Sequence, residues 1–156
     1  MSNSILYSMR PMEERDLDQV LAIDRKCFPD ERNPAPYKND LLYNEMAHYL
    51  VACDTNQTGN PIIGMIGFWM MAGEAHIITI AVRHDRRRQG IGELLLNSAL
   101  ELSKSLEAFA MTLEVRKSNL AAQSLYAKHG FTERGVRKNY YDEVKEDAVI
   151  MTRELE

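Results

Sequence analysis

The chain has 156 residues, of which 45% are hydrophobic and 27% are charged. This composition is typical of globular proteins, and it excludes collagen, coiled-coil rods and largely disordered chains. A length near 150 residues predicts one domain over residues 1–156. The net charge of −4 argues against general nucleic-acid binding, because proteins that bind through phosphate contacts usually carry a basic excess.

Neither a membrane segment nor a metal site is indicated. The longest stretch without charged or strongly polar residues, 61–73, is shorter than the about 20 residues that a membrane helix needs. Cys27 and Cys53 form no CxxC pair, and the four histidines show no HExxH spacing. We expect buried free thiols in a reducing compartment, and the N-terminus has no secretory signal, so a cytoplasmic location is favoured.

Hydrophobic periodicity and turn residues predict the elements of the first half of the chain. We expect a short strand, a helix, a loop with three prolines, a weaker helix and a strand, over residues 5–10, 16–28, 29–36, 37–46 and 49–53. Asp16 and Gln19 have the spacing of a capping box, with Asp16 as the N-cap of the first helix.

The second half alternates between strands and helices. Two apolar, β-branched runs predict a hairpin over residues 62–71 and 75–82, followed by a helix, a strand, a helix and two strands over residues 90–104, 111–116, 119–129, 131–138 and 148–152. Ser118 or Asn119 caps the second of these helices, and Gly130 suits a left-handed C-terminal position. The order predicts an α/β (α+β) fold, with a mixed sheet and helices on both faces.

The sharpest local signal lies between the strand that ends at Val82 and the helix that begins near Gly90. It contains the pattern Arg87-x-x-Gly90-x-Gly92 and four arginines in all, namely Arg83, Arg86, Arg87 and Arg88. Glycines let the backbone approach a ligand, and the first amides of a helix lack partners and carry partial positive charge. We therefore predict a phosphate or pyrophosphate site. The alternatives are a solvated arginine loop and a nucleic-acid patch, although the patch would need interleaved aromatic residues.

Three side chains depart from the local pattern. Glu114 interrupts a predicted interior strand, where a carboxylate is costly unless it is paired or used. It is either a functional group or a surface side chain paired with Arg116. Tyr126 lies on the apolar side of its helix, where core packing is the simpler explanation. Asp24 lies on an apolar helix stripe, and it either faces a cavity or caps a backbone group.

Two aromatic residues begin the final hairpin turn. Tyr140 and Tyr141 stand between Asn139 and Asp142. Paired aromatic rings at this place would either line a peptide groove or cover a sheet edge. We take both tyrosines as candidate substrate-binding residues.

These segments together resemble a known family over nearly the whole chain. Residues 80–92 resemble the acetyl-CoA signature of the GNAT acetyltransferases. The runs LEVRKSN, LY and GF within residues 113–131, and RKNYY and EDA within residues 137–148, are similar to the RimI family, which acetylates the N-terminal alanine of a small-subunit ribosomal protein. The resemblance implies a mixed, mostly antiparallel central sheet of six to seven strands flanked by about four helices.

The resemblance also implies roles for individual residues. Glu114 would be the general base and Tyr126 the general acid. Acetyl-CoA would be the co-substrate, without any metal, and its pantetheine arm and diphosphate would be held by Ile80, Ala81, Val82, Arg87, Arg88, Gln89, Gly90, Ile91, Gly92, Glu93 and Asn119.

The implied reaction transfers an acetyl group from acetyl-CoA to the N-terminal α-amine of a protein, by direct attack in a ternary complex. A ribosomal protein is the candidate acceptor. The alternatives are a broader N-terminal or lysine acetyltransferase, a non-catalytic acyl-CoA-binding module, and a ribosome- or nucleic-acid-binding protein that uses the arginine cluster. Residues 86–88 are more basic than the family loop usually is, and the prolines of residues 29–36 lie where the family gathers part of its peptide-binding surface. Acceptor choice is therefore the property least transferable from the resemblance.

Overall fold

The computed structural model describes residues 7–30, 33–141 and 146–155, with the backbone alone at residues 139–141. In chain order the elements are β1 (Tyr7–Pro11), the short 3-10 helix η1 (Glu14–Asp16), α1 (Leu17–Cys27), α2 (Tyr37–Tyr43), β2 (Ala47–Asp54), β3 (Ile62–Met71), β4 (Glu74–Val82), the short 3-10 helix η2 (His84–Arg86), α3 (Ile91–Ser105), β5 (Ala110–Arg116), α4 (Leu120–Lys128), β6 (Thr132–Tyr141) and β7 (Glu146–Glu154). The predicted order of strands and α-helices is confirmed.

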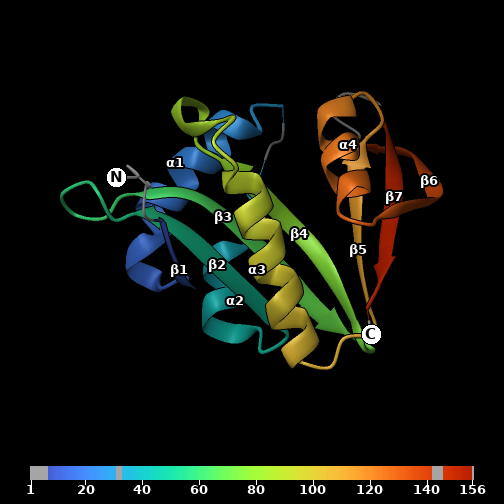
Figure 1. Ribbon diagram of the computed structural model, residues 1–156, viewed down its shortest axis with the longest axis horizontal. Helices are drawn as coiled ribbons and strands as arrows, with labels where there is room; N and C mark the ends of the chain where they lie inside the picture. The colour runs from blue at the N-terminus through green and yellow to red at the C-terminus, as the bar shows by residue number, and fades with distance from the viewer. Residues whose placement is uncertain (1–6, 31–32, 142–145, 156) are drawn as a thin grey trace, which may run out of the picture.

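The seven strands form one sheet in the order β1-β2-β3-β4-β5-β7-β6. Every neighbouring pair is antiparallel except β4 and β5, so the predicted mixed, mostly antiparallel sheet is confirmed. The parallel ladder between β4 and β5 contains only three residue pairs and ends where His76 faces Thr112. Beyond it β4 runs toward α1 and β5 toward α4, and the two strands diverge (Figure 1).

Two apolar cores hold the helices against the two faces of the sheet. The apolar stripe of α3 packs on one face, where Leu95 and Leu96 are fully buried together with Phe68 of β3. The other face is covered by α1 and α2 through Val20 and Tyr37. Figure 1 shows α3 in front of the sheet and α1 and α2 behind it. We call these the α3 face and the α1/α2 face.

A β-bulge in β4 changes which face its side chains occupy. Phe68 pairs with Ile77 and Gly67 with Thr79, so Ile78 is the extra residue. Before the bulge Ile77 packs in the core of the α3 face, whereas after it Thr79 lies 3.5 Å from the hydroxyl of Tyr37 on α2. Strict alternation would place Ile77 and Thr79 on the same face. The bulge therefore re-aims the last third of the strand, where β4 has left β5.

The predicted capping box at the start of α1 is wrong. Asp16 is the N-cap residue of α1, as predicted, but its side chain makes no cap hydrogen bond. Its carboxylate instead accepts hydrogen bonds of 2.7 and 2.8 Å from Arg10 and one of 2.8 Å from the amide of Glu13. Gln19 instead accepts a hydrogen bond of 3.0 Å from the amide of Ile62. Asp16 thus joins the start of α1 to the edge strand β1, since the two parallel hydrogen bonds from a guanidinium pair both carboxylate oxygens with a charged partner.

Candidate active site

A cleft of about 1330 Å³ opens where β4 and β5 separate. Glu114 on β5 and Tyr126 on α4, the two catalytic candidates, both line it. Nine of the eleven predicted co-substrate residues line it as well, namely Ile80, Ala81, Val82, Arg87, Arg88, Gly90, Ile91, Gly92 and Asn119. The fold therefore gathers most of the sequence-predicted site residues at one place.

The start of α3 has the geometry of an anion cradle. Gly90 is the N-cap residue with a left-handed φ of 79°, and no side chain caps the helix start. Nothing lies within 4 Å of the position that a Cβ of Gly90 would occupy. The first amides of the helix thus lack a side-chain cap, and Gly90 leaves the backbone at the helix start accessible, as a diphosphate group requires.

The four arginines before α3 divide into two groups. Arg83 donates hydrogen bonds of 3.0 and 2.7 Å to Asp85, and Arg86 forms a 2.8 Å ion pair with the buried Asp54. Arg87 and Arg88 line the cleft beside Gly90, and so does Arg86 despite its ion pair. Since internal carboxylates pair with two of the four guanidinium groups, the interpretation of the cluster as a nucleic-acid patch is weakened, and the anion cradle gains two nearby cations.

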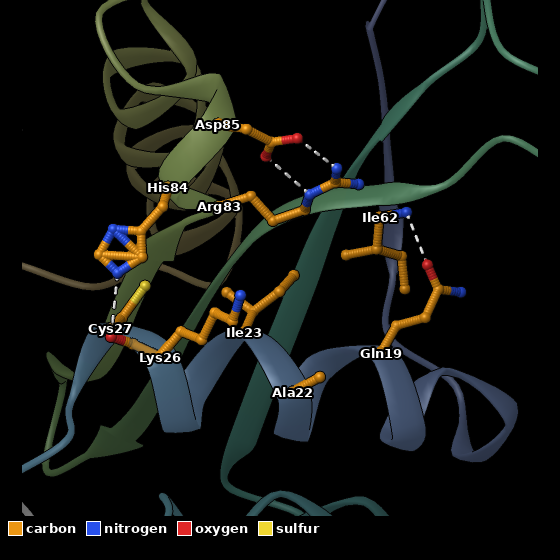
Figure 2. Close-up of a pocket in the computed structure, with 9 residues that line it drawn as sticks. All are labelled: Gln19, Ala22, Ile23, Lys26, Cys27, Ile62, Arg83, His84 and Asp85. Atoms are coloured by element: carbon orange, nitrogen blue, oxygen red, sulfur yellow. Dashed lines mark hydrogen bonds and ion pairs between the residues drawn. The ribbon is translucent and has the colours of Figure 1, made fainter.

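A smaller pocket of about 440 Å³ lies on the α1 side of the same loop (Figure 2). There His84 donates a 3.0 Å hydrogen bond to the carbonyl oxygen of Lys26 at the end of α1. Figure 2 also shows the guanidinium of Arg83 turned toward Asp85. These contacts fix the loop against α1, and they explain why the side chains of Arg83 and His84 are directed away from the cleft.

Glu114 is a buried and paired carboxylate. Its neighbours Leu113 and Val115 pack in the core of the α3 face, so Glu114 points to the α1/α2 face. Only 8% of its side chain is exposed, and its Oε2 accepts a 2.6 Å hydrogen bond from Nε2 of His76. Arg137 on β6 approaches its Oε1 to 3.6 Å. The alternative of a surface side chain is therefore wrong.

Arg116, the partner expected for Glu114 in that alternative, binds other carboxylates. It lies 3.5 Å from Asp30, which follows α1, and 3.9 Å from Glu146 of β7. His76 and Arg137 were not predicted as site residues. His76 carried a detectable signal, because a histidine within the apolar run of β4 is as exceptional as the glutamate within β5.

Tyr126 takes part in the core and in the cleft at once. Its ring belongs to the core cluster of the α3 face and meets Phe131 edge to face, with ring centroids 5.8 Å apart. Burial raises the pKa of Tyr126 to about 12, so the hydroxyl is protonated at neutral pH. Core packing, the simpler explanation from the sequence, is confirmed, but the same residue also lines the cleft.

The remaining predicted co-substrate residues have other contacts. Gln89 accepts a 3.0 Å hydrogen bond from the hydroxyl of Tyr7. Glu93 accepts one of 2.6 Å from Lys128 at the end of α4, and this contact lowers the pKa of Glu93. Their side chains therefore serve the attachment of the loop and of α4.

Asn119 lines the cleft while its Oδ1 caps α4, accepting a 3.1 Å hydrogen bond from the amide of Ala122. The predicted cap is thus confirmed for Asn119. The backbone of Tyr140 and Tyr141 belongs to β6, but their side chains lie outside the described residues.

Asp24 faces the cleft from the α1/α2 face, as one of the two interpretations of its position predicted. It is 5% exposed and accepts a 2.5 Å hydrogen bond from the hydroxyl of Tyr37. Burial raises the pKa of Asp24. The cleft wall on this face thus carries a second buried carboxylate besides Glu114.

Neither cysteine forms a disulfide; Cys53 is buried as expected, whereas Cys27 is only partly buried. Among the residues that the structure describes, no group of three or more histidine, cysteine, aspartate or glutamate side chains is arranged to hold a metal ion. No helix in the described part of the chain combines the length and the apolar character needed to cross a bilayer.

Comparison with known proteins identifies the family. Residues 17–131 match the acetyltransferase (GNAT) family. A protein of Bacillus subtilis (strain 168) with the provisional name ribosomal protein bS18-alanine N-acetyltransferase is 39% identical over 144 residues, which cover 92% of this chain and 93% of the relative. An N-alpha-acetyltransferase of Sulfurisphaera tokodaii is 30% identical over 162 residues, covering 96% of this chain and 93% of the relative.

The fold leads to the same group of proteins. The crystal structure of the ribosomal-protein-S18-alanine N-acetyltransferase from Escherichia coli superimposes with a TM-score of 0.78 at 28% identity, and the match covers 96% of this chain and 94% of that one. The resemblance noted from the motifs is therefore confirmed. The chain belongs to the acetyltransferase (GNAT) family, and it is an acetyl-CoA-dependent N-acetyltransferase.

Proposed function

We propose that the enzyme acetylates the N-terminal α-amine of a protein, and that the N-terminal alanine of ribosomal protein bS18 is its first candidate acceptor. The names of the Bacillus subtilis relative and of the Escherichia coli structure support this acceptor. The observation that carries the proposal is the placement of Glu114 and Tyr126 in one cleft with the helix start at Gly90. A ribosomal acceptor assigns the reaction to the cytoplasm.

Acetyl-CoA fits the cleft in one orientation. Beyond its ladder with β5, which ends at His76, this edge of β4 pairs with no described strand, and residues 80–82 would pair with the pantetheine arm as an added strand would. The amides at Gly90 and Gly92 would hold the diphosphate, with Arg87 and Arg88 beside it. Because Oδ1 of Asn119 is engaged in the helix cap, its amide nitrogen would make the contact with pantetheine.

The chemistry requires a base, because an α-amine with a pKa of about 8 is mostly protonated at neutral pH. Glu114 would take the proton, directly or through one water, and the free amine would then attack the acetyl carbonyl carbon. A C–N bond forms, and a backbone N–H near Val82 stabilises the oxyanion. The C–S bond then breaks, and Tyr126 gives its proton to the departing sulfur. The attacking nitrogen loses its second proton, which restores the phenol of Tyr126 directly or through water.

The pKa of Tyr126, which burial raises to about 12, suits this role in one respect and opposes it in another. The phenol always holds a proton to donate. A thiol in water has a pKa of about 8.5, so complete proton transfer from the phenol is uphill there. Exclusion of water by the bound substrates raises the pKa of the thiol in the same way. We therefore assign proton donation to the moment of C–S cleavage.

The acceptor peptide would enter on the α1/α2 face, toward which Glu114 points. Pro29 and Pro34, which line the cleft, would lie along its path, and Tyr140 and Tyr141 stay candidate contacts of the peptide. Direct attack needs both substrates bound together, which positions the amine against the thioester. Incubation with acetyl-CoA alone should accordingly release no stoichiometric CoA, whereas an acetyl-enzyme intermediate would give a burst.

The function is tested by acetyl-CoA turnover against a peptide panel. The peptides begin with Ala, Ser, Met or Thr, and one has a blocked N-terminus and an internal lysine. Mass spectrometry then locates the added acetyl group. We expect modification at the free α-amine, fastest for the peptide that begins with alanine. Turnover of the blocked peptide alone would contradict the proposal and indicate a lysine acetyltransferase, and acetyl-CoA binding without any turnover would indicate a binding module.

A broader N-terminal acetyltransferase is the second candidate, because the Sulfurisphaera tokodaii N-alpha-acetyltransferase is similar over 96% of this chain. The same panel separates the two candidates. A broad enzyme acetylates the peptides that begin with Ser, Thr and Met at rates close to that for Ala, whereas a bS18-type enzyme is much faster with Ala.

A further inference from the structure

His76 and Glu114 form a short contact at the point where the sheet opens. Nε2 of His76 lies 2.6 Å from Oε2 of Glu114. The side chain of Glu114 is 8% exposed and that of His76 28% exposed. His76 is thus the more accessible member of the pair, and both residues line the cleft.

The register of the strands brings the two side chains together. His76 faces Thr112 in the last pair of the parallel ladder, and Glu114 follows two positions further along β5. Residues two apart on a strand share a face, so Glu114 and Thr112 both point to the α1/α2 face. His76 precedes the bulge at Ile78 and therefore shares that face, opposite to its neighbours Ala75 and Ile77 in the other core.

The reaction creates a need for a proton outlet beside Glu114. An α-ammonium loses two protons when it becomes an amide nitrogen, whereas the departing sulfur gains only one. One proton must therefore reach solvent in each turnover. The buried carboxyl of Glu114 must be deprotonated before it can accept the next proton. Within the described residues, the ionisable side chains that contact Glu114 include His76 on β4 and Arg137 on β6. Arginine does not release protons in proteins, whereas imidazole exchanges them with water near neutral pH.

We propose that His76 is a positioning residue that holds Glu114 by its Nε2–H and carries each proton from Glu114 to solvent. This rests on the proposed function, in which Glu114 is the base. His76 acts through Glu114 and makes and breaks no bond of the substrates. After Glu114 has taken a proton, the partly exposed ring exchanges through solvent to the tautomer that carries its hydrogen on Nδ1. The carboxyl then gives its proton to Nε2 along the 2.6 Å hydrogen bond, and the Nδ1 proton is lost to water or buffer, which restores the Nε2–H form.

The test compares His76→Gln with His76→Ala. Glutamine retains an N–H that can bind the carboxylate but cannot relay a proton, and alanine removes both functions. We expect the Kd for acetyl-CoA and the KM for the peptide to stay within about twofold of wild type in His76→Gln, while kcat falls about tenfold or more. Added imidazole should restore kcat in both variants in proportion to its concentration, because a small base can take the proton that His76 carried.

Two controls keep the outcomes distinct. His48→Gln replaces another strand histidine of the same sheet, which stacks on Phe68 and lies outside the cleft, and it should leave kcat and the imidazole response unchanged. Glu114→Gln should have a low kcat that imidazole does not raise, since the carboxylate that passes protons to His76 is absent. Thermal unfolding verifies that each variant is folded.

Two results would overturn the relay. One is wild-type kcat across the pH range in His76→Gln, and the other is a slow His76→Gln that imidazole does not accelerate, which would leave His76 a structural partner only. If Glu114→Gln itself turns over at the wild-type rate, the base assignment fails, and the relay fails with it. If wild-type protein acetylates no peptide, the proposed function fails before His76 is questioned.

Discussion

Glu114 and Tyr126 reach the same cleft from opposite faces of the sheet. Glu114 points to the α1/α2 face, whereas Tyr126 belongs to the core of the α3 face. In a continuous sheet the two groups could not act on one bond, because the strands would lie between them. The separation of β4 from β5 beyond His76 removes this barrier. A base on one side and a donor on the other can then act on opposite ends of the reacting C–N and C–S bonds.

Glu114→Gln should lower kcat/KM by about 10² to 10⁴-fold, because the amide cannot take the ammonium proton. The loss should shrink as the pH rises through about 8, where the amine loses its proton to water unaided. Steady-state kinetics from pH 6 to 9 measures this, and calorimetry should show an unchanged Kd for acetyl-CoA. Glu133→Gln, at an exposed position of β6, is the matched control. Unaltered turnover in Glu114→Gln would refute the assignment of the base.

Tyr126→Phe should bind acetyl-CoA normally and transfer the acetyl group about 10² to 10⁴-fold more slowly, since only the donor to sulfur is lost. The ring remains, so its packing against Phe131 is retained. Single-turnover measurements separate the chemical step from product release. Tyr43→Phe, whose position on α2 is 79% exposed, serves as the control. A Tyr126→Phe variant as fast as wild type would leave Tyr126 a packing residue.

Gly90→Ala should weaken acetyl-CoA binding by at least about fivefold, equivalent to about 1 kcal/mol, because the added methyl group occupies open space at a residue that lines the cleft. Gly59→Ala is a matched control. Gly59 has a φ of 83° and Gly90 one of 79°, and neither has an atom within 4 Å of a Cβ. Both variants should lose about 1 to 2 kcal/mol of stability from the left-handed strain. Calorimetry should find the change in Kd in Gly90→Ala alone; an equal change in both would contradict the cradle.

Asp16→Asn should lower the free energy of unfolding by about 1 to 3 kcal/mol at pH 7, because a buried charged hydrogen bond to Arg10 is lost. The hydrogen bond from Arg10 lowers the pKa of Asp16. The stabilisation by this hydrogen bond is therefore complete at pH values above about 3.9, the pKa of Asp16 in the unfolded chain. It is lost as the pH falls through the lower pKa that Asp16 has in the folded protein. Urea unfolding should show the difference from wild type shrinking below about pH 4. Asp18→Asn, on the exposed side of α1, should change stability by only about 0.5 kcal/mol.

The parts of the fold that followed from the sequence are those with local causes. The stripe of α3 and the alternation of β5 are visible within a few residues, and so was Glu114 as an exception to that alternation. The cap of α4 by Asn119 is also local. The phosphate-binding end of the cleft was expected from the glycines and arginines between Val82 and Gly90. The catalytic part was expected only through the family motifs, because no local pattern reveals where two strands part.

The missed features all depend on distant partners. The bulge at Ile78 is defined by the register with β3. His76 and Glu114 are 38 positions apart and meet only because their strands pair in parallel. Asp16 was assigned to its own helix, whereas its partner Arg10 lies on β1. In each case a long-range contact decided between two locally acceptable arrangements.

The short ladder between β4 and β5 has a consequence for the lifetime of the protein. Only three residue pairs form the ladder between β4 and β5. A thioester ligand that binds between these strands would pair with β4 and act as an additional strand of the sheet. Ligand at a hundred times its Kd adds about 2.7 kcal/mol to the stability of a folded state. Without the ligand the enzyme should therefore unfold at a lower temperature and be cleaved faster by a protease.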